Sequence, residues 1–160
     1  MKISVLSVGR IGSGPEATLC EDYARRAAPL LRTLGMRGPD LAEMRESRRD
    51  NSTQRRDEEA EALLRRIPDG ATIIALDEGG KQLASREFAG LIETAAAAGT
   101  AEIAFVIGGP DGHGDAVMKR ANRTIAFGAM TWPHKLVRAA LCEQIYRAAT
   151  ILAGHPYHRD

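Results

Sequence analysis

A glycine-rich segment at residues 108–112, Gly-Gly-Pro-Asp-Gly, directly follows an apolar run at residues 101–107. The β-branched residues of that run are typical of a strand buried on both faces of a sheet. A ligand can approach the backbone closely at Gly108, which has no Cβ atom, and Pro-Asp-Gly is common turn chemistry. The pattern predicts a strand that ends in a ligand-binding loop. A glycine turn that only connects two elements is equally consistent with this segment taken alone.

Two further loops have a similar character. One follows an apolar run at residues 71–76 and has the sequence Asp-Glu-Gly-Gly-Lys, and the other covers residues 127–133 after a short apolar run at 124–127. In parallel α/β sheets, ligands bind beyond the carboxyl ends of the strands. The three loops are therefore the candidates for a binding site.

The elements that must position these loops alternate along the chain. Strand patterns cover residues 3–8, 36–44, 71–76, 101–107 and 124–127, although Gly38-Pro39 weakens the second. Helix patterns lie between them: a first helix that Pro29 should end or bend, a second capped by Ser52 or Thr53, a third capped by Ser85, a short segment at 116–120, and a long helix from His134 to about residue 153. This order predicts an α/β fold with a mostly parallel sheet, helices on both faces, and one domain over residues 1–160.

Composition narrows the functional class. The chain has 160 residues, 44% of them hydrophobic, and 22 basic against 21 acidic residues give a net charge of +1. This charge creates no global attraction for nucleic acid or an anionic membrane. Cys20 and Cys142 form no metal-ligand pattern and no disulfide framework, so we expect no metal and a reducing, cytoplasmic location. No run of eighteen apolar residues and no signal-peptide pattern occurs, so we expect a soluble protein without membrane partners.

An arginine-rich segment at residues 45–52 has no apolar member and is expected to be an exposed loop. Its arginines could contact phosphate, but mixed charge of this kind is more often solvated surface. The role of residues 45–56 stays open at this point.

Four motifs carry a resemblance to a known family. They are Val-Ile-Gly-Gly-Pro-Asp-Gly at 106–112, Met-Thr-Trp-Pro-His-Lys-Leu-Val-Arg at 130–138, Glu-Gln-Ile-Tyr-Arg-Ala at 143–148 and His-Pro-Tyr-His-Arg at 155–159. In this order they resemble the RlmH family, the SPOUT-class methyltransferases of large-subunit ribosomal RNA. The resemblance covers essentially the whole chain. It implies a C-terminal trefoil knot, a homodimer, and methyl transfer from S-adenosylmethionine to N3 of a pseudouridine in helix 69 of 23S rRNA.

The resemblance also implies residue roles. The cofactor residues that it implies lie in the three glycine-containing loops: Leu76, Gly108, Phe127, Gly128, Ala129, Met130, Thr131 and Trp132. Those loops are the ones that the strand pattern indicates. His134, Arg138 and His155 are the expected contacts to the RNA.

Catalysis needs little side-chain chemistry, because the methyl group of a sulfonium is already activated. The imide N3 of pseudouridine must lose its proton, which requires a base or a strong acceptor. His155, Tyr157 and His158 are the candidates, and Arg159 or Arg138 could hold a phosphate or an anionic base edge. We expect Tyr157, His158 and Arg159 to be catalytic. A frayed terminus is the ordinary alternative for such a polar tail.

Two functional classes remain open, a ribosomal RNA methyltransferase and a ribosome-binding factor of the same fold without activity. A nucleotide-dependent oxidoreductase would need G-x-G-x-x-G after the first strand, where only Gly9-Arg10-Ile11-Gly12 occurs. The small residues Ala139, Ala140, Ala148 and Ala149 of the last helix suggest close packing in a homodimer. The low net charge suggests the assembled ribosome as substrate, because naked RNA would be held mainly by charge.

Overall fold

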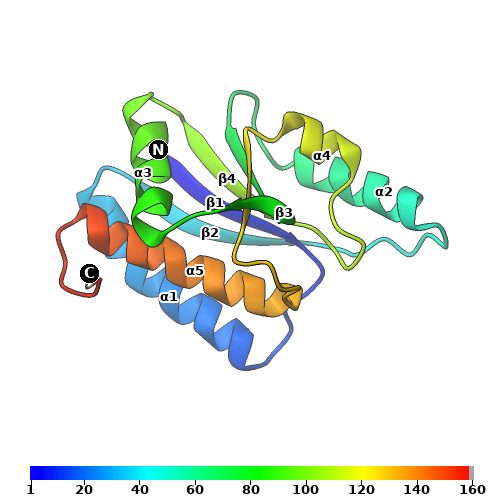
Figure 1. Ribbon diagram of the computed structural model, residues 1–160, viewed down its shortest axis with the longest axis horizontal. Coiled ribbons are helices and arrows are strands. Elements are labelled where there is room, and N and C mark those ends of the chain that lie inside the picture. Colours follow the sequence, from blue (N-terminus) through cyan, green and yellow to red (C-terminus); the bar gives the residue numbers. More distant parts are fainter. Residues whose placement is uncertain (159–160) are drawn as a thin grey trace.

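The computed structural model describes residues 1–158 as alternating strands and helices (Figure 1). In chain order the elements are β1 (Lys2–Val8), α1 (Pro15–Thr33), β2 (Arg37–Met44), α2 (Ser52–Leu64), β3 (Thr72–Gln82), α3 (Ser85–Ala97), β4 (Glu102–Ile107), α4 (Asp115–Arg120), β5 (Arg123–Ala126) and α5 (His134–Leu152).

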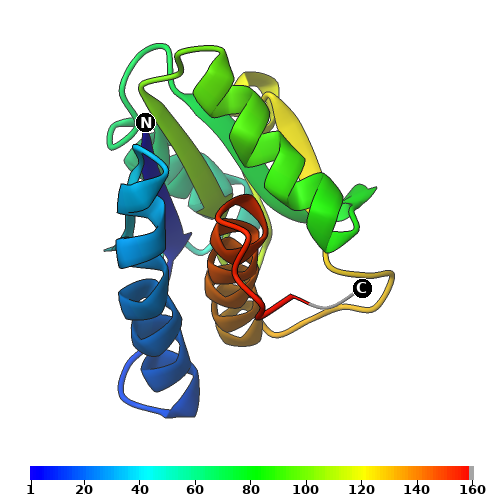
Figure 2. The ribbon, with the colours of Figure 1, turned by 90° about the vertical axis from the view of Figure 1, so that its left-hand side faces the viewer.

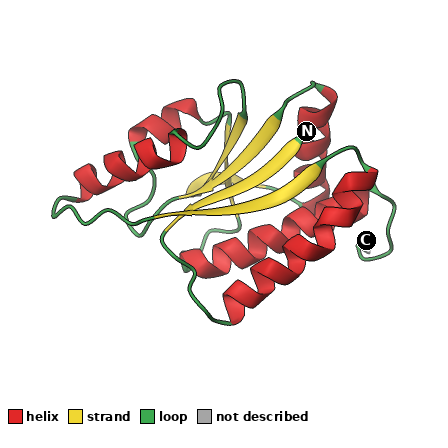
Figure 3. Cartoon of the chain, turned by 180° about the vertical axis from the view of Figure 1, so that it is seen from behind, coloured by secondary structure: helices red, strands yellow, loops and turns green. Residues whose placement is uncertain are grey.

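The five strands form one sheet in the order β2-β1-β4-β3-β5, and every strand pairing is parallel. Figure 3 shows the sheet with helices on both sides. The prediction of a mostly parallel α/β sheet covered on both faces is confirmed. Because all strands run the same way, their carboxyl ends lie along one edge of the sheet.

Alternation along the central strand β4 explains the two layers. Ile103, Phe105 and Ile107 belong to the core beneath α1, α3 and α5. Ala104 and Val106 point to the opposite face and belong to the core beneath α2 and α4. Successive side chains of a strand point to opposite faces, so a strand buried on both sides is apolar throughout. Figure 2 shows α5 lying between α1 and α3 on the first face.

Pro29 was expected to end or bend helix α1; the helix continues past it to Thr33, so an end at this proline is wrong. The turn around the proline carries Ala27 and Leu31, which are at most 1% exposed in the core. Packing of this face against the sheet and α5 outweighs the backbone hydrogen bond that proline removes.

Two helix starts also differ from the prediction. Asn51, not Ser52 or Thr53, caps α2, since its Oδ1 accepts hydrogen bonds from the backbone N–H groups of Thr53 (2.8 Å) and Gln54 (3.2 Å). Helix α3 begins at Ser85 itself, whose hydroxyl donates to Gln144 of α5 (2.9 Å). In α2 the cap is a local contact of Asn51, and in α3 the side chain of Ser85 is used for a contact with α5.

Strand β2 forms despite Gly38-Pro39, because it lies at the edge of the sheet, where a missing backbone N–H is tolerated. Strand β3 extends beyond Leu76 to Gln82, with a shift of register against β5 between Leu76 and Lys81. The turn predicted after Leu76 is therefore an irregularity inside a longer strand.

The alanines of α5 are used within the chain. Ala139, Ala148 and Ala149 are at most 7% exposed and pack against neighbouring elements of the same chain. These three residues therefore provide no surface for a dimer, while Ala140, the fourth alanine of the prediction, is only half-buried. Within residues 1–158 no helix is both long enough and apolar enough to span a membrane. The C-terminal knot stays a prediction from the resemblance.

Candidate functional site

The carboxyl ends of β3, β4 and β5, three neighbouring strands, surround a cavity of about 460 Å³. The order of the sheet thus brings together the three loops that the sequence indicated. The wall consists of Arg56, Leu76, Asp77, Glu78, Ile107, Gly108, Gly109, Pro110, Asp111, Gly112, His113, Ala126, Phe127, Gly128, Met130, Thr131, Trp132, His134 and Val137.

Most of the expected cofactor residues lie on this wall. Leu76 is 8% exposed at the end of the regular part of β3, and Gly108 follows β4 directly. The segment after β5 supplies Phe127, Gly128, Met130, Thr131 and Trp132. Ala129 belongs to the same segment but does not line the cavity.

The glycine loop, residues 108–112, is a tight turn closed by a hydrogen bond from Gly112 N to Gly109 O (3.0 Å). A Cβ atom at Gly108 would lie 2.8 Å from the carbonyl carbon and oxygen of Gly112. Only glycine allows this close approach, so the turn folds back on the end of β4. All five residues of the turn line the cavity.

His113, at the end of the glycine loop, is a cavity residue that the sequence analysis did not single out. Its Nε2 atom lies 3.0 Å from the carbonyl oxygen of Leu76. Burial lowers the pKa of His113, while the Leu76 carbonyl and Asp77 raise it. A neutral ring that donates from Nε2 fits these surroundings. Its position next to the glycine turn was the only sequence signal for it.

Charges of both signs line the cavity. Asp77 and Glu78 contribute carboxylates, and Thr131 Oγ1 lies 3.4 Å from Glu78 Oε2. Arg56 of α2 contributes a guanidinium. The cavity can therefore accommodate a zwitterionic ligand, with cationic and anionic groups at different points of the wall.

The three residues expected to contact RNA do not lie together: His134 lines the cavity, whereas Arg138 and His155 do not. His134 is the first residue of α5 and lines the cavity, where burial lowers its pKa. Arg138 is 3% exposed, and its guanidinium donates to the carbonyls of Val8 and Gly9. Its Nη1 also pairs with Glu43 (3.1 Å). A direct contact of Arg138 with RNA would require the guanidinium to leave these partners.

The tail folds back onto its own chain. The Tyr157 hydroxyl donates to Glu143 (3.1 Å), and its ring lies 4.6 Å from that of Tyr146. His158 Nδ1 lies 3.4 Å from Arg147 Nη1. His155 is exposed, and Arg159 lies outside the described residues.

The cavity includes His134 and Val137 from the first turn of α5, whereas Tyr157 docks on Glu143 in the middle of that helix. The expected catalytic residues Tyr157 and His158 do not line the cavity of their own chain. Within residues 1–158, His, Cys, Asp and Glu side chains form no group of three that could hold a metal ion.

Comparison with known proteins gives consistent matches. The family model described as predicted SPOUT methyltransferase matches residues 1–158. The ribosomal RNA large subunit methyltransferase H of Hyphomonas neptunium is 48% identical over 159 residues, which cover 99% of each chain. The protein of the same name from Bradyrhizobium sp. ORS 278 is also 48% identical, over 99% of this chain and 98% of its own.

A solved structure shows a similar fold. The crystal structure of a probable methyltransferase from Bordetella pertussis Tohama I superposes with a TM-score of 0.52 at 17% identity. The match covers 92% of this chain and 95% of that one. At this identity the likeness concerns the fold alone.

Proposed function

The chain belongs to the SPOUT methyltransferases, in the family of ribosomal RNA large subunit methyltransferase H, and from that premise we propose that it methylates 23S rRNA with S-adenosylmethionine. One observation supports this proposal above the others. Three loops from strands that are distant in sequence meet around one cavity at the carboxyl edge of the sheet.

The cavity fits S-adenosylmethionine in size and charge. Its volume of about 460 Å³ lies within the range of small-molecule sites. Asp77 and Glu78 suit the sulfonium and ammonium groups, and Arg56 suits the carboxylate. Backbone groups of the glycine loop and of residues 127–132 are available for the adenine and the methionine chain.

The bound cofactor would supply an activated methyl group. The residues of this chain then have to align donor and acceptor and to exclude water. Phe127, Met130 and Trp132 supply apolar surface at the cavity for this purpose. His134 lies on the wall beside them, where its imidazole can contact the entering nucleotide.

We assign the acceptor to N3 of a pseudouridine in helix 69, on the basis of the family. Loss of the N3 proton needs an acceptor in reach. Burial and Glu143 raise the pKa of Tyr157 to about 12, so its hydroxyl is a donor at neutral pH. His155 and His158 are then the better candidates for the base, because an imidazole ring can accept a proton as a general base. Arg159 completes the proposed catalytic group.

A homodimer would join the tail to the cavity. Because Tyr157 and His158 do not line the cavity of their own chain, we assign the tail to the cavity of a partner. Exposed apolar side chains lie at and beside the cavity, with Met130 73%, Trp132 45% and Leu136 39% exposed. These residues, not the alanines of α5, are the proposed contact surface for the partner or the RNA.

The assembled ribosome is the proposed substrate. A net charge of +1 gives only a small electrostatic term for binding naked RNA. Recognition should then depend on the shape of a folded RNA surface. Methylation of free 23S rRNA as fast as of ribosomes would contradict this assignment.

Mass spectrometry of the helix 69 fragment tests the function. Ribosomes that lack the modification are incubated with S-adenosylmethionine and either the protein or its Gly108→Val variant. We expect one added methyl group on the pseudouridine with the native protein and none with the variant. Tight ribosome binding without methylation would favour the non-catalytic factor instead.

A further inference from the structure

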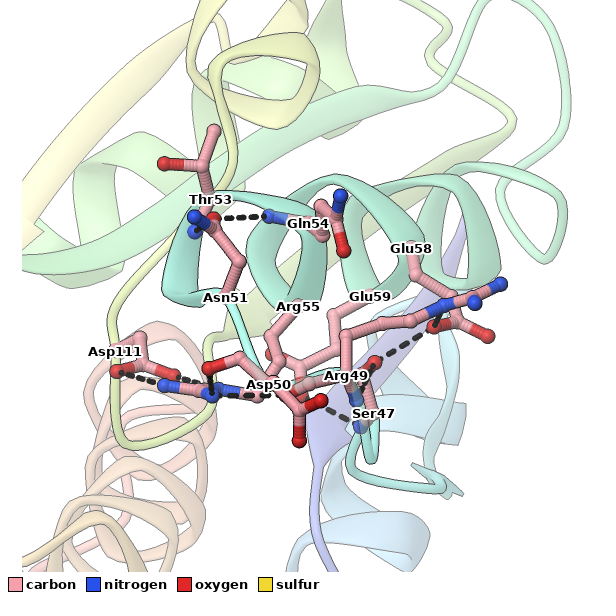
Figure 4. A network of polar contacts seen from close by, with 10 residues as sticks. All are labelled: Ser47, Arg49, Asp50, Asn51, Thr53, Gln54, Arg55, Glu58, Glu59 and Asp111. Carbon is pink, nitrogen blue, oxygen red and sulfur yellow. Dashed lines mark hydrogen bonds and ion pairs between the residues drawn. The ribbon is translucent and has the colours of Figure 1, made fainter.

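Helix α2 and the preceding segment pack against the glycine loop that lines the cavity (Figure 4). Residues 108–112 contain three glycines, and one backbone hydrogen bond closes their turn. Glycine-rich segments lose much conformational freedom when they are ordered. A loop of this composition needs outside contacts to keep one shape before a ligand arrives.

Arg55 makes the principal contact. Its Nε donates to Asp111 Oδ2 (2.7 Å) and its Nη2 to Asp111 Oδ1 (3.2 Å), across 56 residues of sequence. Its Nη1 donates to the carbonyls of Arg49 (2.8 Å) and Asp50 (2.9 Å). One planar guanidinium thus connects the glycine loop to residues 49–50, a geometry that arginine provides and lysine does not.

Local structure places Arg55 for this role. Asn51 caps α2, so the helix begins at a defined residue one turn before Arg55. The backbone N–H of Arg55 donates to Asn51 O (3.0 Å). The side chains of Arg55 and Asp111 are each 28% exposed, so water screens their ion pair only in part. The pair lowers the pKa of Asp111 through the hydrogen bond from Arg55.

Two more residues of α2 lie close to the loop and to Gly114, which follows it. A Cβ atom at Gly109 would lie 2.8 Å from Glu59 Oε2, and one at Gly114 would lie 2.9 Å from the Ala60 Cβ. Glu59 is 4% exposed, and its Oε1 accepts from Ser47 N (2.9 Å). Helix α2 therefore packs closely along the loop. Arg55 is the residue of α2 that forms hydrogen bonds with the loop, through Asp111.

We propose that Arg55 is a positioning residue for the cofactor, which it serves by holding Asp111 and so keeping residues 108–112 in the conformation that binds S-adenosylmethionine. Residues 45–56, whose role the sequence left open, thereby gain a role in the cofactor site. The inference rests on the proposed function. Because Arg55 acts on the shape of the loop, its loss raises the free-energy cost of binding and leaves the methyl-transfer step unchanged once the cofactor is bound.

Calorimetry with S-adenosylmethionine tests the inference on the full chain. We expect Arg55→Gln and Asp111→Asn each to weaken binding about fivefold, as for a partly shielded bidentate pair. The double variant should be no weaker than either single one, because both remove the same contact. Arg55→Lys should restore part of the affinity. The matched control is Arg65→Gln, which removes the same charge from the end of α2, where Arg65 pairs with Glu61 (3.9 Å) and is 72% exposed.

Kinetics on ribosomes supply the second readout. In Arg55→Gln, KM for S-adenosylmethionine should rise while kcat at saturating cofactor stays within twofold of the native value, with an unchanged melting temperature of the ligand-free protein. If kcat and the melting temperature fall together with affinity, Arg55 is a general stability residue and the inference is wrong. If Arg55→Gln binds S-adenosylmethionine as tightly as the native protein, the inference is wrong but the proposed function is not affected. A native protein without affinity for S-adenosylmethionine would overturn the proposed function and the inference together.

Discussion

The imidazole Nε2 of His113 lies 3.0 Å from the carbonyl oxygen of Leu76, which is 37 residues earlier in the chain. This contact joins the end of the glycine loop to the end of the regular part of β3. Both residues line the cavity, so the hydrogen bond fixes the relative position of two of its walls. The other ring nitrogen, Nδ1, is buried and has no hydrogen-bond partner within residues 1–158.

Replacing His113 should therefore affect the cofactor site. His113→Phe keeps an aromatic ring and removes the hydrogen bond to Leu76, and we expect cofactor affinity to fall about fivefold, as for one hydrogen bond of roughly 1 kcal/mol. His113→Gln retains a hydrogen-bond donor for the Leu76 carbonyl, so its cofactor affinity should fall less. Calorimetry with S-adenosylmethionine measures both, and equal affinity of His113→Phe and the native protein would show that this contact does not shape the site.

The same residue predicts a pH dependence of stability. Burial lowers the pKa of His113 below its ordinary value of 6.5. Below pH 6.5 the unfolded chain then binds more protons at this residue than the folded one, so stability falls as the pH falls. Urea unfolding at pH 7.5 and pH 5.5 should show that the free energy of unfolding falls more for the native protein than for His113→Gln. An identical loss in both proteins would show that His113 does not contribute.

Gly108→Val should abolish cofactor binding. The new side chain would collide with the backbone of Gly112 and His113, 2.8 to 3.1 Å from its Cβ, and push the turn out of shape. Binding should weaken more than tenfold in calorimetry, because the turn is a cavity wall. The control is Gly90→Ala in α3, where a Cβ atom meets nothing within 4 Å. If Gly108→Val binds S-adenosylmethionine as tightly as the native protein, this turn does not touch the cofactor.

Arg138→Met should lower stability by about 3 kcal/mol, since it leaves buried polar partners unpaired. Its guanidinium bonds to the carbonyls of Val8 and Gly9 from a position that is 3% exposed. Denaturant unfolding measures the change, with exposed Arg10→Met as the matched control. A loss of RNA binding at native stability would instead assign Arg138 to the substrate.

Deleting residues 155–160 should leave cofactor affinity nearly unchanged and remove methyl transfer, because His155, Tyr157 and His158 do not line the cavity of their own chain. A mixed dimer of tail-deleted and Gly108→Val chains should regain one working site if the tail acts across the dimer. Sedimentation must first show a species larger than the 17.3 kDa monomer. Full activity of the deletion would exclude a catalytic tail, and an inactive mixed dimer would show that each tail serves its own chain.

The sequence by itself determined the elements and the loops of the site. The apolar runs of the strands, the apolar spacing of the helices and the glycines after residues 76 and 107 are local signals, because each depends on neighbours in the chain. They were enough to predict a parallel α/β sheet and to indicate the loops after β3, β4 and β5. The boundaries at Pro29, Asn51, Ser85 and the end of β3 differed. Packing keeps α1 helical past Pro29, Ser85 bonds to Gln144 of α5, and β3 continues past Leu76 against β5. The cap at Asn51 is a local contact with Thr53 and Gln54.

Only the tertiary structure decided which side chains meet. The strand order β2-β1-β4-β3-β5 makes β4, β3 and β5 neighbours, and so turns three separate loops into one cavity. The pairs Arg55–Asp111 and His113–Leu76 follow from how α2 and the loops pack on that sheet. Burial of Arg138 and docking of Tyr157 on Glu143 arise in the same way. No local pattern encodes such contacts, because they depend on the distances that folding sets between residues far apart in sequence.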